Sequence, residues 1–352
     1  MSGVNLKQII ASIAFLALGV VLFLIGFETR STLLIAVVGI GLGVLLAPLI
    51  TIMQTKFHIP RALAALLLLL FVVIGVGIVG WAIFDLVTDQ ARALLERAPQ
   101  IAEMAKERLE RVLASQPWLE PRIRSLDLAD EAQATARTLF SGLQLTLTAI
   151  IGMALVFIIG LYTALNSNAY FKGFLSLFPA YERPRVTIIM NEAGTQLRRW
   201  FRSQLMVMTV TAIITTIALK IIGIDFWLLL GILTGAFGII PFIGAFLTGA
   251  LTVLVALGTQ PEQVWWVLAL YLAIQQIEAH VTVPIIMRGG VELPEIHLII
   301  LMLVLSQIFG IMGVLIAPPL LAVGRSIYLM TYVPKMNDLR KPPAKTPLPA
   351  RI

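Results

Sequence analysis

Cysteine is absent from this sequence of 352 residues, and charged residues are few. The lack of cysteine excludes disulfides, thiolate metal sites, a cysteine nucleophile and palmitoylation. Charged residues make up 13% of the chain and hydrophobic residues 59%, and the mean hydropathy is +0.95. Soluble globular domains average about 25% charged and about 45–50% apolar residues. A soluble protein of this composition would expose too much apolar surface, so the sequence predicts an all-α integral membrane protein.

The common signatures of enzymes are also missing: there is no HExxH, no GxSxG and no P-loop. The three histidines, His58, His280 and His297, fall in three separate segments. The stretch GVGIVG (75–80) matches GxGxxG, but it lies inside an apolar run, where glycines serve close helix packing. We therefore expect no enzyme activity, no metal site and no cofactor. The net charge of +7 is typical of Lys and Arg retained in cytoplasmic loops, so no nucleic-acid partner is expected.

Apolar runs divide the chain into four regions. We expect a three-helix membrane region over 1–87, a charged extramembrane segment over 88–142, a five-helix membrane core over 143–333 and a basic, proline-rich tail over 334–352. A membrane span needs about 20 apolar residues. The expected spans are 8–27, 32–53, 62–87, 143–165, 205–222, 225–257, 262–284 and 296–324. The sequence thus predicts about eight transmembrane helices.

The distribution of basic residues predicts the orientation. If 225–257 counts as one crossing, the loops and ends on one side carry 15 Lys and Arg, and the opposite short loops carry 3. Basic residues accumulate on the cytoplasmic side. We therefore expect both termini in the cytoplasm.

The segment 88–142 carries 8 basic and 9 acidic residues, with apolar residues at helical spacing between them. This pattern predicts amphipathic helices outside the membrane, interrupted at Pro99, Pro117 and Pro121. Two interpretations stay open, a solvated charged hairpin, which we favour, and a gate over a substrate path.

The run 225–257 is longer than one span requires, and Pro241 and Gly244 interrupt it. Proline removes a backbone donor and frees a carbonyl one turn earlier. The run is either one long Pro-broken helix or a pair of half-helices. Interrupted hydrophobic segments point to transport sites, although a simple packing kink has the same pattern.

Polar residues gather in QQIEAHVTVP (275–284), inside an apolar run. Ionisable groups at bilayer depth mark pathways, proton relays or buried pairing networks. Glu278 and His280 point about 200° apart on a helix, so they cannot both line one narrow pore. A proton relay would use Glu278, with His280 facing a neighbouring helix, and a structural hydrogen-bonding role for Glu278 is the alternative. The candidates for transport or proton coupling are Glu278, Gln275, Gln276 and His280.

Three ordered motifs in the C-terminal half carry a family resemblance: IIPFIGAFLTGAL (239–251), QQIEAHVTVPIIMRGGVEL (275–293) and GIMGVLIAPPLLA (310–322). With RRWFRSQ before the fifth span, they resemble the autoinducer-2 exporter family, which includes the PerM-type permeases. The residues that match the family motifs are Pro241, Gly244, Gln275, Glu278, Pro284, Gly310, Gly313 and Pro318. His280 departs from the Asn that the family commonly has there, and Pro294-Glu295 replaces its usual His-Pro.

The resemblance implies a multi-pass protein of a bacterial or archaeal plasma (inner) membrane and a homo-oligomer, a pentamer among the assemblies it allows. It also implies export of a small polar signalling molecule in some members and sodium/proton antiport in others. Three functions follow as hypotheses: proton-coupled transport of a small polar solute, a cation/proton antiporter on the same fold, and a non-transporting oligomeric scaffold.

Overall fold

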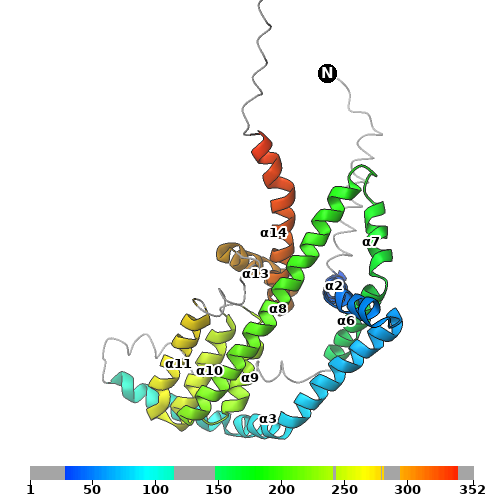
Figure 1. Ribbon diagram of the computed structural model, residues 1–352. Coiled ribbons are helices and arrows are strands. Elements are labelled where there is room, and N and C mark those ends of the chain that lie inside the picture. The colour runs from blue at the N-terminus through cyan, green and yellow to red at the C-terminus, as the bar shows by residue number, and fades with distance from the viewer. Residues whose placement is uncertain (1–27, 115–146, 241–242, 279, 281–293, 340–352) are drawn as a thin grey trace, which may run out of the picture. The chain divides into compact units, whose positions relative to one another are not determined.

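The computed structural model describes residues 28–114, 147–240, 243–278, 280 and 294–339, drawn as coloured ribbons in Figure 1. These ranges contain helices and connecting turns and no strand. The expected first span 8–27, the segment from 115 to 142 and the tail from 340 lie outside them. The helices are α2 Arg30–Phe57, α3 Arg61–Ala114, α6 Leu147–Leu165, α7 Ser167–Ser176, α8 Arg183–Ile222, α9 Trp227–Phe237, α10 Ile243–Thr259, α11 Val264–Ile277, α13 Glu295–Phe309 and α14 Ile311–Leu339.

Several described helices have the length and composition of membrane spans. Four qualify alone, and α6 with α7, bent by 81° at their junction, would make a fifth. Three shorter apolar helices are α9, the part of α10 from Gly244, and α13. The prediction of an all-helical membrane protein is confirmed, and the count of eight spans stays a prediction.

The chain forms two compact units, and each is described by itself. Unit 1 comprises Met1–Pro48, Ile158–Arg199 and Val291–Ile352, and unit 2 comprises Leu49–Phe157 and Trp200–Gly290. The four regions that the sequence predicts, 1–87, 88–142, 143–333 and 334–352, describe membrane topology. The two compact units do not test that division.

In unit 1, glycines bring helices into close contact. A Cβ built on Gly43 of α2 would lie 2.5 Å from Thr163 Cβ on α6, and one built on Gly160 would lie 3.1 Å from the carbonyl oxygen of Gly39. Small residues four apart on α2 thus allow α6 to approach its backbone. α13 and α14 also pack against each other in this unit.

Unit 2 is built around α8 to α11, which follow one another as antiparallel neighbours (Figure 1). Gly231 of α9 faces Thr216 of α8. One turn further along α9, Gly235 faces Ala212, which lies one turn before Thr216 on α8. The turn between these helices contains Gly223, whose φ of +88° is a left-handed conformation that favours glycine. This pairing fixes α9 against the second half of α8.

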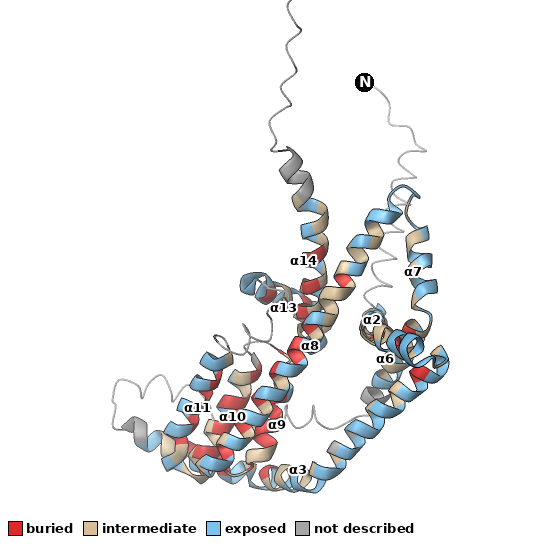
Figure 2. Cartoon of the chain, in the orientation of Figure 1, coloured by how far each residue is buried: buried red, intermediate tan, exposed pale blue. Residues whose placement is uncertain are grey.

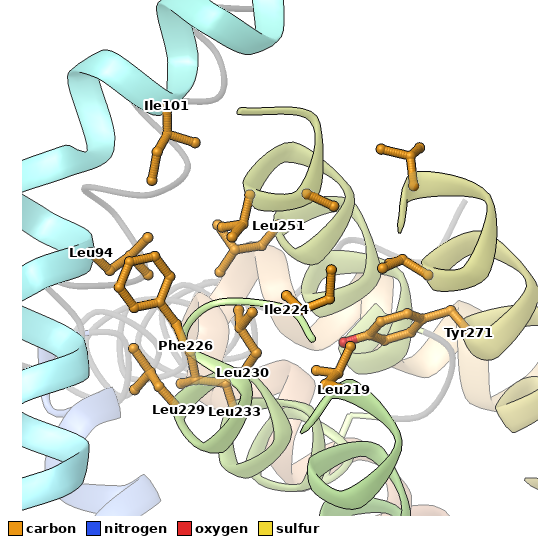
Figure 3. Packing of buried hydrophobic residues seen from close by; sticks show 14 residues of the cluster. Leu94, Ile101, Leu219, Ile224, Phe226, Leu229, Leu230, Leu233, Leu251 and Tyr271 are labelled. Carbon is orange, nitrogen blue, oxygen red and sulfur yellow. The ribbon is translucent and has the colours of Figure 1, made fainter. Parts of the chain in front are cut away.

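The charged half of α3 packs across one end of this group. Arg108 Nη1 donates to the Leu257 carbonyl oxygen of α10 at 2.5 Å, and the Leu229 amide of α9 donates to Gln90 Oε1 at 3.0 Å. Leu94 and Ile101 of α3 join the buried cluster of α8 to α11, whose packing Figure 3 shows. Buried residues gather on α9 and α10 in Figure 2.

The structure corrects one expectation about α3. Pro99 was expected to interrupt the charged segment, yet it lies inside a helix that runs without a break from Arg61 to Ala114. Proline removes only its own amide donor, and the buried Leu94 and Ile101 hold both flanks of Pro99 against the core. Tertiary packing therefore overrides the helix-breaking tendency. Pro117 and Pro121 lie outside the described residues.

Candidate functional site

The segment expected as either one broken helix or two half-helices forms two helices, α9 and α10, between which the chain reverses. A Cβ on Gly244 would collide with the carbonyl group of Phe237, so the start of α10 lies directly against the end of α9. The Gly244 amide donates to the Ile240 carbonyl at 3.1 Å, which closes the turn. Pro241 lies outside the described residues. Gly244 matters here because no side chain fits this approach.

A buried glutamine from α8 bonds to the backbone at this reversal. Gln204 Nε2 donates to the Gly238 carbonyl oxygen at 2.7 Å, and Gln204 is only 7% exposed. Gly238 directly follows the last residue of α9, where a helix leaves carbonyl groups without intrahelical partners. The sequence prediction missed Gln204. Gln204 could have been identified from the sequence as the polar residue at the end of RRWFRSQ, directly before an apolar run.

A cluster of hydroxyl groups lies inside unit 2. The Tyr271 hydroxyl on α11 is 2.9 Å from Thr234 Oγ1 on α9 and 2.8 Å from Thr252 Oγ1 on α10. All three residues are buried. Each threonine also donates within its own helix, Thr234 to the Leu230 carbonyl and Thr252 to the Thr248 carbonyl.

Counting protons shows that the hydroxyl cluster has more contacts than it can satisfy at once. Thr234, Thr252 and Tyr271 supply one hydroxyl proton each, for two contacts to carbonyls and two contacts between hydroxyls. One of the four contacts is therefore always without a proton. The cluster can therefore hold its protons in several arrangements.

Glu278, the residue directly after the last residue of α11, lies on the same side of this helix as Tyr271 and at the level of the reversal. Seven residues separate the two side chains, which on a helix places them within about 20° of one direction. Tyr271 meets Gly249 of α10, where a Cβ would lie 3.1 Å from its ring. Glu278 lies about 10.5 Å further along α11 than this contact. Gly244 lies about 7.5 Å from Gly249 in the same direction, because α10 runs antiparallel to α11. The structure thus brings Glu278 and Gly244 to the same end of the helix group.

The surroundings of Glu278 suit an exchangeable group. Its side chain is half-buried, and within the described ranges no hydrogen bond reaches its carboxyl group. The α10 helix begins at about the same level of the helix group.

The other polar residues at the end of α11 and just after it are more accessible. Gln275, Gln276 and His280 are exposed, while Glu278 is not. His280 Nδ1 lies 3.1 Å from the Gln276 carbonyl oxygen, one turn earlier. Glu278 and His280 therefore differ in exposure. Pro284 lies outside the described residues.

The C-terminal motif belongs to unit 1, where it joins α13 to α14. Gly310 has φ of +61° at the junction, and a Cβ on Gly313 would collide with the backbone of Leu305. Pro318 is fully buried. In unit 1 these residues allow α14 to fold closely back on α13.

Comparisons with known proteins give a consistent result. A family model described as "AI-2E family transporter" matches residues 10–332. The chain is 24% identical over 296 residues to "Putative transport protein YrrI" of Bacillus subtilis, covering 82% of this chain and 83% of that protein. It is 21% identical over 295 residues to "Putative transport protein YueF" of the same organism, with 80% and 79% covered. The protein "Putative transport protein sll0060" of Synechocystis is 20% identical over 276 residues, with 75% and 78% covered.

Proposed function

The chain belongs to the AI-2E transporter family, and on this premise we propose that it moves a small polar solute across the membrane, with Glu278 coupling the movement to protons. It is a multi-pass membrane protein. We propose further that it works as a homo-oligomer in a bacterial or archaeal plasma membrane. The solute would enter or leave unit 2 at the α9–α10 reversal.

One observation carries this proposal: the reversal and Glu278 lie at the same end of unit 2. Non-helical backbone at membrane depth is tolerated only inside protein or beside a water-filled cavity. Ends of discontinuous helices supply backbone groups that bind polar substrates. Glu278 adds a titratable carboxyl group at the same level, which a solute carrier coupled to protons requires.

Buried hydroxyls supply polar groups deeper in the unit. Thr234, Thr252 and Tyr271 form the cluster described above, and Thr215 of α8 is fully buried with a hydroxyl oxygen that no described group bonds. A buried polar atom without a partner carries a cost that a bound polar molecule or water removes. These residues support a polar route through α8 to α11.

The test is solute flux in proteoliposomes with Glu278→Gln. The amide has nearly the same shape but cannot take up a proton at physiological pH, so flux should lose its pH dependence while folding and assembly stay intact. Glu262→Gln is the matched control, because Glu262 lies in the exposed turn before α11. Flux of Glu278→Gln that keeps both its rate and its pH dependence would refute proton coupling through this residue.

A cation/proton antiporter is the second candidate, favoured by the oxygen-only chemistry of the hydroxyl cluster. Hydroxyl and carbonyl oxygens suit hard cations. Sodium-dependent proton movement in vesicles without any organic solute, reduced by Thr252→Val, would favour this function. Stable oligomers that show no flux of solute or cation under any gradient would support the scaffold hypothesis instead.

A further inference from the structure

A second candidate site, with charged residues around it, lies in unit 2 at the end remote from Glu278. It is a shallow, largely open cavity of about 530 Å³ between α3 and the turn that joins α8 to α9. Its floor includes Ile224 and Phe226, which are buried. The proposed transport route does not use this cavity.

The charged groups around the cavity are balanced in sign. Arg97 and Lys220 are basic, and Asp89 and Asp225 are acidic. Among the described residues, the side chains of Asp89, Arg97 and Asp225 have no ion pair or hydrogen bond. Lys220 Nζ lies 4.7 Å from the centre of the Trp227 ring, which holds this cation at the rim. Two positive and two negative charges around one hollow match a ligand that carries both signs.

An apolar track on α8 leads toward the same cavity. Ile213, Ile217 and Ile221 are 53%, 54% and 80% exposed. They lie four residues apart and so share one face of the helix. Lys220 and Trp227 at the end of this track are residue types that anchor at the membrane–water interface. The combination is a shallow hollow with charged residues around it and an apolar path beside it.

We propose that this cavity binds the headgroup of a zwitterionic phospholipid with a primary ammonium, while an acyl chain lies along the isoleucines of α8. The phosphate is held by Arg97 and Lys220, and the ammonium by Asp89 and Asp225. A primary ammonium donates hydrogen bonds to carboxylates, which a quaternary ammonium cannot do. An anionic headgroup without an ammonium leaves both carboxylates facing negative charge.

The test is native mass spectrometry of the full-length protein, with phosphatidylethanolamine, phosphatidylcholine and phosphatidylglycerol of identical acyl chains added separately. The wild type should bind phosphatidylethanolamine most tightly. Removing one partly exposed charge partner should weaken binding by about two- to fivefold, so Asp225→Asn and Arg97→Gln are each expected to show this loss. Glu96→Gln, on α3 but outside the cavity lining, is the matched control and should bind as the wild type does.

The double variant Asp89→Asn/Asp225→Asn gives the sharper result. With both carboxylates neutral, only the basic groups remain, so the preference should change from phosphatidylethanolamine to phosphatidylglycerol. A reversal of preference cannot come from simple loss of folding. Equal binding of the three lipids by the wild type, or an unchanged order in the double variant, would overturn the proposal. So would displacement of the lipid by soluble glycerophosphoethanolamine at equal concentration, because the site would then be one for a free zwitterion.

Discussion

Tyr271 on α11 bonds to Thr252 on α10, with 2.8 Å between the two hydroxyl oxygens. Thr252 gives its own proton to the Thr248 carbonyl, 2.7 Å away. In that arrangement Tyr271 must be the donor to Thr252, and it then has no proton for Thr234. One phenol group thus links α9, α10 and α11, and its proton decides which helix it bonds more strongly.

Tyr271→Phe should weaken unit 2 modestly. The ring and its packing against Gly249 stay, and both threonines keep their bonds within their own helices, so the loss is about 1 kcal/mol of unfolding free energy. Thermal unfolding in detergent measures it. Tyr328→Phe, an exposed tyrosine of α14, is the control and should change little. Equal effects of the two substitutions would show that the cluster adds nothing to stability.

Gly244→Ala should disrupt the reversal. The new methyl group meets the Phe237 backbone, which cannot rotate away, so we expect a loss of about 1–3 kcal/mol or more. Gly75→Ala in α3 is the matched control, because no atom lies within 4 Å of its Cβ. That change should instead be neutral or gain up to about 1 kcal/mol, since alanine favours helix. Thermal unfolding of the two variants should show changes in stability of opposite sign. A Gly244→Ala variant as stable as the wild type would contradict the close approach of α9 and α10.

Gln204→Leu removes the side-chain amide that bonds to the end of α9. The Gly238 carbonyl then loses its partner in a partly buried position, which should cost about 1–3 kcal/mol. Gln276→Leu, at an exposed position of α11, is the control and should be nearly neutral. Hydrogen exchange of the α9 and α10 amides would locate the effect, and it should accelerate there in the Gln204 variant alone.

The sequence predicted the helical membrane class because long apolar runs require it. It could not choose between a kink and a reversal near Gly244, since glycine and proline permit both. The reversal depends on contacts of Gly244 with Phe237 and of Gln204 with Gly238, which only the folded chain brings together. The same reason hides Thr234, Thr252 and Tyr271: they come from three helices, and each residue alone is ordinary in an apolar span.

The α9–α10 reversal also bears on the number of membrane passages. The Asp225 amide, before α9, donates to Gln260 Oε1, after α10, across 3.5 Å and 35 residues of sequence. The two ends of the hairpin therefore lie side by side at one end of unit 2, so they would share one side of a membrane that the hairpin enters. The predicted total of eight counts the run 225–257 once, so it requires an odd contribution from this segment. A topology in keeping with the hairpin places the residues on either side of it in the same aqueous compartment.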